Sequence, residues 1–207
     1  FPNFIDFSRF KKTNKDHFKK AIAPNGEKIL VHTSNFRKVK RVEDVIQIFC
    51  IVSKEIPSKL LMIGDGPERQ NAEVLARSLC THMDVRFLGK QEAVEELLAI
   101  ADVFLMPSET ESFGLAALEA MACEVPVVSS NAGGIPEVNI EGETGFLLDV
   151  GDVAGMAKRT LELLQDEDKL AQFKKNAFAQ AQKFDISSIL PQYEAFYEKV
   201  KNSGKCK

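Results

Sequence analysis

The chain has little of the chemistry on which metal, redox and membrane proteins depend. It contains no tryptophan, two tyrosines, three histidines and four cysteines among 207 residues. The histidines, His17, His32 and His82, lack the spacing of metal ligands, so we expect each to be structural. No apolar run approaches the roughly 18 residues that a transmembrane helix needs. We therefore expect no metal, no cofactor and no membrane span.

The four cysteines, Cys50, Cys80, Cys123 and Cys206, form no CxxC pair, which leaves a zinc or thiol-exchange site without support. The first three lie in apolar helical contexts, and we expect free, buried thiols in a reducing cytoplasm. The opening residues do not resemble a signal peptide, because no charged stretch leads into an apolar one. Both observations predict a cytoplasmic protein.

Positive charge is concentrated at the front of the chain. Residues 1–41 hold eleven basic and three acidic residues, a net charge of +8, whereas the whole chain carries −3. Such a front end is found in nucleic-acid-binding proteins, but aromatic residues do not alternate with the basic ones here. We expect no nucleic-acid partner. We interpret Lys11–Lys20 as a solvated or domain-facing surface and Arg37–Arg41 as a candidate anion site.

Short apolar runs alternate with helical patterns over residues 27–165. The runs predict strands at Ile29–His32, Leu60–Ile63, Val85–Leu88, Val103–Met106, Val125–Ser129 and Phe146–Leu148. The intervening patterns predict helices at Val42–Val52, Glu68–Leu79, Ala93–Ala101 and Leu115–Ala122. Strands separated by helices of this length indicate βαβ crossovers and therefore a parallel sheet. The predicted fold is an α/β, Rossmann-like doubly wound domain.

The two ends of the chain differ from this central domain. Residues 1–26 contain Pro2, Pro24 and Gly26 and are interpreted as an interdomain linker with a short basic helix. Residues 166–207 are predicted to be helical and to pack back toward a domain that is absent from the sequence. The predicted helices after the last strand are Asp152–Gln165, Glu167–Phe184 and Ser187–Lys201. Because the chain lacks an initiator methionine, we expect it to be part of a longer protein.

Residues 107–122, PSETESFGLAALEAMA, follow a predicted buried strand and open a helix. Gly114 lets the backbone approach a ligand closely, and the free N–H groups of the first helical turn form an anion site. Glu111 precedes that turn and Glu119 lies about one turn inside the helix, so that the carboxylates flank a phosphate-sized site. Carboxylates are good acceptors for sugar and ribose hydroxyls.

This segment resembles the Glu-x7-Glu signature of retaining GT-B glycosyltransferases of family 4. The likeness covers nearly the whole chain, in the family's order: Pro2-Asn3, Val31–Arg41, Ile63–Pro67, Phe87–Gly89, Ser129–Glu137 and Thr144–Leu147. The resemblance implies the nucleotide-sugar-binding C-terminal domain of such an enzyme, with extra C-terminal helices. It also implies sugar transfer with retention of configuration and without a metal ion.

The loop after the first predicted strand departs from the family at one position. In the family, an arginine and a lysine five positions apart hold the donor diphosphate. Lys40 matches the lysine, but Asn35 stands where the arginine would be. We expect Arg37, from the same loop, to supply the missing guanidinium, although it also fits a plain surface charge.

The resemblance implies roles for the remaining site residues. The expected catalytic residues are Arg37, Lys40 and Glu111, with Glu111 orienting the sugar and Glu119 binding the ribose. The backbone of Arg86 and Phe87 would meet the base. The other expected substrate-binding residues are Ser34, Asn35, Gly64, Ser112, Phe113, Gly114 and Leu115.

Two other motifs are given structural interpretations. Residues 64–69, GDGPER, lack the third glycine of a dinucleotide fingerprint and are interpreted as a strand–helix turn edging the cleft, with Gly64 close to the ligand. The acidic triplet Asp166-Glu167-Asp168 lies at a predicted helix junction far from the strand ends, and we do not interpret it as a metal site.

Within the family, residues 34–42 and 109–115 look most like those of the bacterial enzymes that join N-acetylglucosamine from UDP-GlcNAc to L-malate in bacillithiol synthesis. The implied partners are a UDP-GlcNAc donor, L-malate and the missing N-terminal domain. Two alternatives stay open, namely a family member with a lipid or polysaccharide acceptor and a non-catalytic sugar-nucleotide-binding module. A homo-oligomer is compatible with the sequence, which does not determine the oligomeric state.

Overall fold

A computed structural model describes residues 4–11, 13, 16–79, 84–187, 189 and 201. Its centre is a six-stranded sheet in the order β3-β2-β1-β4-β5-β6, and every neighbouring pair is parallel. The strands are β1 (Lys28–Ser34), β2 (Ser58–Gly64), β3 (Val85–Gly89), β4 (Val103–Met106), β5 (Val127–Ser130) and β6 (Gly145–Leu148). This strand order is that of the Rossmann fold, so the predicted fold class is confirmed.

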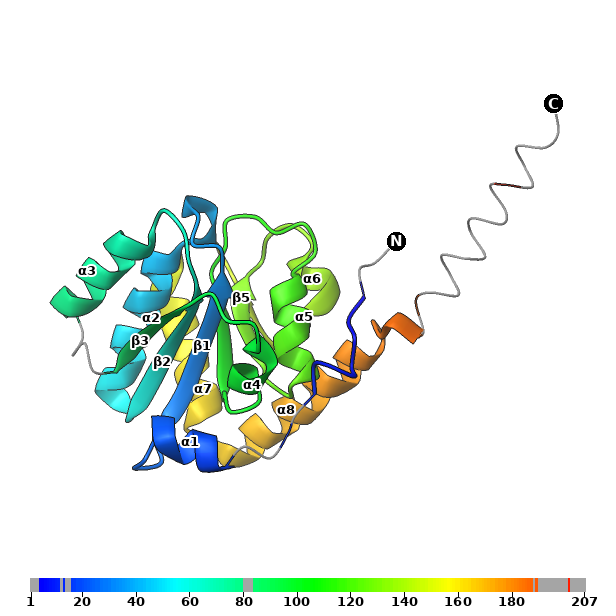
Figure 1. Cartoon of the computed structure of the whole chain (residues 1–207), viewed down its shortest axis with the longest axis horizontal. Coiled ribbons are helices and arrows are strands. Elements are labelled where there is room, and N and C mark those ends of the chain that lie inside the picture. Colours follow the sequence, from blue (N-terminus) through cyan, green and yellow to red (C-terminus); the bar gives the residue numbers. More distant parts are fainter. Residues whose placement is uncertain are drawn as a thin grey trace.

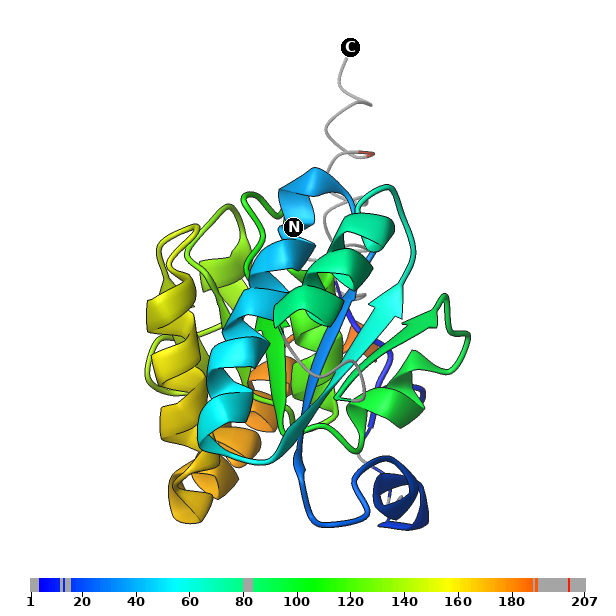
Figure 2. The ribbon, with the colours of Figure 1, turned by 90° about the vertical axis from the view of Figure 1, so that its left-hand side faces the viewer.

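Helices cover both faces of the sheet (Figures 1 and 2). The α-helices are α1 (Asp16–Ile22), α2 (Val42–Glu55), α3 (Arg69–Leu79), α4 (Val94–Leu98), α5 (Leu115–Ala122), α6 (Ile135–Val138), α7 (Val153–Leu164) and α8 (Glu167–Gln182). A short 3-10 turn, η1 (Lys38–Lys40), precedes α2. One apolar core lies between the sheet and α2, α3, α7 and the start of α8, and the other lies under α4, α5 and the end of α8.

Helix α2 shows how the sequence pattern produces these layers. Its apolar side chains at Val42, Val45, Ile46 and Phe49 recur at helical spacing, and all four are buried against the sheet. The acidic residues of the first turn stabilise the helix, because their negative charges lie at the positive end of the helix dipole. The helix ends at an extended residue directly before Pro57, because a residue before proline is disfavoured in the helical conformation.

Most predicted elements are present, with bounds that differ by a few residues. The strand predicted to begin at Val125 begins at Val127, because residues 123–126 complete the turn that leaves α5. The helix predicted over Ala93–Ala101 is confined to Val94–Leu98. The four-residue helix α6 was not predicted, since its short, glycine-led sequence carries no periodic pattern. The predicted helix Ser187–Lys201 lies almost entirely outside the described residues.

The N-terminal segment runs beside the end of α8 (Figure 1). The Ile5 amide donates to the Phe184 carbonyl at 2.9 Å, and the Ile186 amide donates to the Ile5 carbonyl at 3.0 Å. Phe7 stacks edge-on against Phe178 of α8, at 5.7 Å between ring centroids. Helix α8 itself packs on α5, so the first of the C-terminal helices belongs to the helical layer of the sheet. The predicted contact of residues 166–207 with a further domain stays a prediction.

The expectation of free cysteine thiols is wrong at one position. Cys50 is disulfide-bonded, whereas Cys123 is free and buried at the C-terminal end of α5. No CxxC spacing indicated this bond, and none is needed, because disulfide partners meet through the fold rather than through local spacing. Cys80 and Cys206 lie outside the described residues. Among the described helices, none is both long and apolar enough to cross a membrane.

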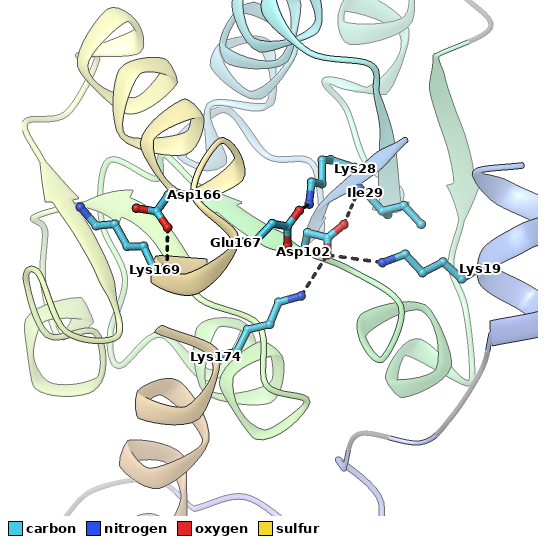
Figure 3. A network of polar contacts seen from close by, with 8 residues as sticks. All are labelled: Lys19, Lys28, Ile29, Asp102, Asp166, Glu167, Lys169 and Lys174. Carbon is cyan, nitrogen blue, oxygen red and sulfur yellow. Dashed lines mark hydrogen bonds and ion pairs between the residues drawn. The ribbon is translucent and has the colours of Figure 1, made fainter. Parts of the chain in front are cut away.

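Charged groups join the terminal helices to the sheet at the edge where the strands begin (Figure 3). The side chain of Asp102 is 4% exposed and accepts from the Ile29 amide at 3.0 Å. It also accepts from Lys174 of α8 at 2.9 Å and from Lys19 of α1 at 3.4 Å. Burial raises the pKa of this carboxyl, but the two lysines and the amide outweigh burial and hold the pKa below its ordinary value.

The acidic triplet after α7 has structural roles at the same edge (Figure 3). Asp166 caps α8 by accepting from the Lys169 amide at 2.9 Å. Glu167 forms an ion pair with Lys28 of β1, although its side chain is 76% exposed. These contacts explain the first two acidic residues without a metal ion.

We expect Asp102→Asn to lower the free energy of unfolding by about 2–3 kcal/mol, because it removes the counter-charge of two lysines and weakens a buried hydrogen-bond network. The carboxylate contribution should persist above pH 4, near the pKa of an unfolded aspartate, and disappear as the pH falls through the lower folded pKa. Urea unfolding at pH 7 and pH 3 measures both effects.

Glu167→Gln is the matched control, because it removes a charge from the same edge at an exposed position. It should change the stability by less than about 0.5 kcal/mol. Equal losses for the two variants at pH 7 would contradict the role given to Asp102.

Candidate functional site

The predicted site residues gather at the edge where the strands end. The sheet order reverses between β1 and β4, and ligands of open α/β sheets bind in the crevice at such a point. The loop that follows Ser34 leaves β1 there, and residues 107–114 leave β4 beside it. The Glu109 amide donates to the Val39 carbonyl at 2.8 Å, which joins the two loops directly.

Lys40 and Glu111 form an ion pair across these two loops. Lys40 Nζ donates to Glu111 Oε1 at 2.5 Å, and the two side chains are 21% and 15% exposed. Ser108 Oγ donates to the same carboxylate oxygen at 2.9 Å. A cation and a hydroxyl-accepting carboxylate therefore lie side by side, held by neighbours and partly open to solvent.

The other charged residues of the first loop have different surroundings. Arg37 is exposed and forms no salt bridge with any described residue. Asn35 is also exposed. Arg41 pairs with Asp44 at 2.6 Å and with Glu109 at 3.1 Å. The structure thus places Arg37 on the loop of Lys40 but does not bring it against Glu111.

Glycines let neighbouring loops meet the site loops backbone to backbone. A Cβ atom on Gly64 would lie 1.8 Å from the Ser34 carbonyl oxygen, and Gly64 has a φ of 120°. A Cβ atom on Gly133 would lie 2.0 Å from the Glu111 carbonyl oxygen. No other residue fits either position. Gly64 is therefore required for packing, and its predicted contact with a ligand stays a prediction.

Helix α5 begins at the site without a side-chain cap. Its N-cap residue is Gly114, in the left-handed region with a φ of 88°. The first N–H groups of a helix have no intrahelical partner, so this turn offers donors and a positive dipole end. Ser112 and Leu115 beside it are exposed, whereas Phe113 is buried against Phe184. Phe113 can therefore offer a ligand its backbone rather than its ring.

Glu119 lies further along α5, on the flank that faces α4. Burial raises the pKa of this carboxyl to about 7, Arg9 opposes the rise, and Glu95 adds to it. Arg9 itself is bound to Glu95 at 3.2 Å and to the Glu92 carbonyl at 2.7 Å. The two glutamates of the signature therefore differ: Glu111 has a lysine partner, whereas Glu119 is a half-buried carboxyl that titrates near neutrality.

The predicted base-binding residues lie within the outermost strand of the sheet, before its carboxyl end. Arg86 and Phe87 belong to β3, the edge strand of the sheet. The Arg86 side chain points to α1, where it donates to the Ile22 carbonyl at 3.5 Å. Phe87 is partly buried against the core under α2 and α3. Both residues also pair with β2 in the sheet, and their predicted contact with the base stays a prediction.

Several residues that support the site were missed or undervalued from the sequence. Ser108 holds Glu111, and Ser130 in turn donates to the Ser108 carbonyl. His32 is fully buried in β1, where its ring bonds to Leu105 and Ser34. For His32 the available signal was a polar residue directly after the apolar run of a buried strand, because such a group needs a buried partner.

Comparison with known proteins identifies this arrangement. The family model of the glycosyl transferases group 1 matches residues 13–180. The chain belongs to this family. It is 45% identical over 205 residues to the N-acetyl-alpha-D-glucosaminyl L-malate synthase of Bacillus anthracis, covering 98% of the chain and 54% of that relative. It is 37% identical to the sulfoquinovosyl transferase SQD2 of Arabidopsis thaliana, over 70% of the chain and 29% of that protein.

Solved structures of glycosyltransferases share the fold. Sucrose-phosphate synthase from Thermosynechococcus elongatus superposes with a TM-score of 0.85 at 26% identity, over 98% of the chain and 52% of that protein. HepE from Anabaena, in complex with UDP and glucose, superposes with a TM-score of 0.84 at 26% identity, over 95% of the chain and 55% of that protein. The chain therefore has the fold of a GT-B half and spans about half the length of these proteins.

We expect Glu119→Gln to stabilise the chain above pH 7 by about 1–2 kcal/mol. The wild-type carboxyl has a folded pKa of about 7, above its ordinary value of 4.5, so its stabilising contribution exists below pH 4.5 and disappears as the pH rises through 7. Denaturant unfolding at pH 5 and pH 8.5 should show the difference growing with pH. The exposed Glu143→Gln is the control, and a constant difference for Glu119→Gln would count against a buried carboxylate.

Proposed function

We propose that the chain is the donor-binding half of a retaining, metal-independent glycosyltransferase that transfers N-acetylglucosamine from UDP-GlcNAc to L-malate. The observation that carries the proposal is the Lys40–Glu111 pair, which lies between two strand ends and next to the uncapped start of α5. The name of the B. anthracis relative supports the choice of sugar and acceptor. A cytoplasmic location is part of this proposal.

The diphosphate of the donor would bind between the first loop and α5. Lys40 would exchange Glu111 for a phosphate oxygen, and the N–H groups after Gly114 would donate to another. Arg37 is exposed on the same loop and would supply the second cationic side chain. Fixed positive charge of this kind stabilises a departing diphosphate where its negative charge develops.

The remaining groups would hold the sugar, the ribose and the base. Glu111, once free of Lys40, would accept from sugar hydroxyls while Ser108 keeps it in place. Glu119 would accept from the ribose hydroxyls, and the backbone of Arg86 and Phe87 would meet the base. Backbone groups of Ser34, Asn35, Gly64, Ser112, Phe113 and Leu115 would line the rest of the donor site.

The proposed reaction takes place on one face of the sugar. The bond between C1 and the β-phosphate oxygen breaks, and its electron pair leaves with UDP. The acceptor hydroxyl forms the new bond to C1 from the same side, which retains the configuration. The departing phosphate oxygen takes the hydroxyl proton, so no side chain is needed as a general base.

The acceptor would be held mainly by the other half of the protein. The paired segments near Ile5 and Asp185 would lead toward the other domain, as would residues 166–207. A homo-oligomer stays a prediction.

Lys40→Ala should weaken UDP binding by about 1.5–3 kcal/mol, the usual size of a hydrogen bond to a charged group, and should hardly affect uridine. The reason is that only UDP carries the charge that Lys40 would meet. Arg37→Ala should act in the same direction. Isothermal titration of both ligands measures the difference, with the exposed Lys38→Ala as a charge-matched control. Equal losses for UDP and uridine would reject the diphosphate role.

The chain alone should bind UDP but form no glycosyl-malate. Holding two reactants in position contributes on the order of 7–11 kcal/mol to lowering a barrier, and the groups placed here would hold the donor alone. An open half-site also lets water screen the charges that would stabilise the leaving group. Mass spectrometry of the chain incubated with UDP-GlcNAc and L-malate measures whether any glycosyl-malate forms. Product formed at the rate of the full-length enzyme would show that the donor half suffices.

A further inference from the structure

His32 is the largest polar side chain of the sheet interior that lies beside the site. It sits in β1, fully buried, and its ring stacks between Phe36 and Phe104 at centroid distances of 6.1 and 6.4 Å. Both ring nitrogens are engaged. Nδ1 lies 2.8 Å from the Leu105 carbonyl oxygen, and Nε2 lies 2.9 Å from Ser34 Oγ.

These partners determine where the protons lie. A carbonyl oxygen can only accept, so Nδ1 carries the proton and donates to Leu105. Burial, with Lys40 adding to it, lowers the pKa of His32 to about 4, so the ring is neutral at physiological pH. Nε2 is then an acceptor, and the Ser34 hydroxyl must donate to it. The Ser34 oxygen in turn accepts from the Phe36 amide at 3.2 Å.

The end of this chain of hydrogen bonds is the bend of the first site loop. Phe36 has a φ of 42°, in the left-handed region that side chains other than glycine rarely adopt. Its amide is held by Ser34, its ring stacks on His32, and its carbonyl accepts from the Glu68 amide at 2.9 Å. After this bend the chain enters η1, which carries Lys40 to Glu111.

We propose that His32 is a positioning residue that, through the Ser34 hydroxyl, fixes the bend at Phe36 and thereby sets Lys40 for the diphosphate of the donor. This inference rests on the proposed function. It also assigns the Ser34 side chain a task other than the predicted ligand contact. Because its proton points inward to His32, the hydroxyl cannot donate to a phosphate oxygen, and its backbone alone remains for the ligand.

Two single variants and their combination test this relay, by which we mean the hydrogen bonds from His32 through Ser34 to the Phe36 amide. Ser34→Ala removes the hydroxyl, and His32→Asn keeps a donor near Leu105 but is too short to reach Ser34. Each should lower the affinity of the chain for UDP about five- to tenfold and that for uridine less than twofold. The double variant should bind UDP with an affinity within twofold of that of either single variant, because each single substitution already breaks the same series of hydrogen bonds. Ser58→Ala is the control, a buried serine of β2 bonded to the Ile56 carbonyl.

A measurement without ligand separates this inference from the proposed function. Nitrogen-15 NMR of the free chain should show His32 protonated at Nδ1 and neutral down to pH 5. Ser34→Ala should speed exchange of the Phe36 amide at least tenfold, and Ser58→Ala should not. If His32→Asn does not fold, Ser34→Ala still tests the relay through UDP affinity and the exchange rate of the Phe36 amide.

Three results would overturn the relay: a proton on Nε2 of His32, unchanged exchange at Phe36, or losses of UDP affinity that add in the double variant. Equal losses for uridine and UDP would also overturn it, since a general packing defect acts on both ligands. Failure of the wild-type chain to bind UDP would instead reject the proposed function, while the NMR result would still decide on the relay.

Discussion

The close approach of backbones at the strand ends is the constraint on which the site depends. Gly64 lies against the Ser34 carbonyl and Gly133 against the Glu111 carbonyl, each at a distance that leaves no room for a Cβ atom. These contacts hold the two loops that carry Lys40 and Glu111. A side chain at either glycine would push a loop outward and separate the ion pair, although neither glycine bears a chemical group. The charge geometry thus follows from backbone packing.

The two edges of the sheet hold charge in opposite ways. At the edge where strands begin, Asp102 is buried and accepts from two lysines and an amide, so nothing is left for a ligand. At the other edge, Lys40 and Glu111 are partly exposed, and Glu119 is a carboxyl whose burial outweighs the opposing charge of Arg9. The proposed sugar-nucleotide donor could replace the Lys40–Glu111 ion pair there at a modest cost in free energy. The saturated edge therefore serves stability, and the unsaturated edge is the one at which the proposed donor would bind.

The periodicity of the sequence predicted the order and type of most elements, because buried parallel strands and amphipathic helices leave strong local patterns. It also placed Lys40 and Glu111 at strand ends, where the structure brings them together. It did not predict that the charge of Arg9 acts on the pKa of Glu119, since that interaction joins segments about 110 residues apart. The disulfide at Cys50 was missed for the same reason, and the helix α6 was missed because its four residues are too few to show a periodic pattern.

The departure at Asn35 gains a physical meaning from the bend that follows it. If Arg37 replaces the family's arginine, its backbone starts two residues further along, which in an extended chain is a displacement of about 7 Å. Such a displacement would carry the guanidinium past the diphosphate. The left-handed conformation of Phe36 breaks the extended path between the two positions, and His32 and Ser34 are the groups that hold it. If Arg37 fills the proposed role, the bend at Phe36 that His32 and Ser34 hold is what would direct the loop back toward the donor.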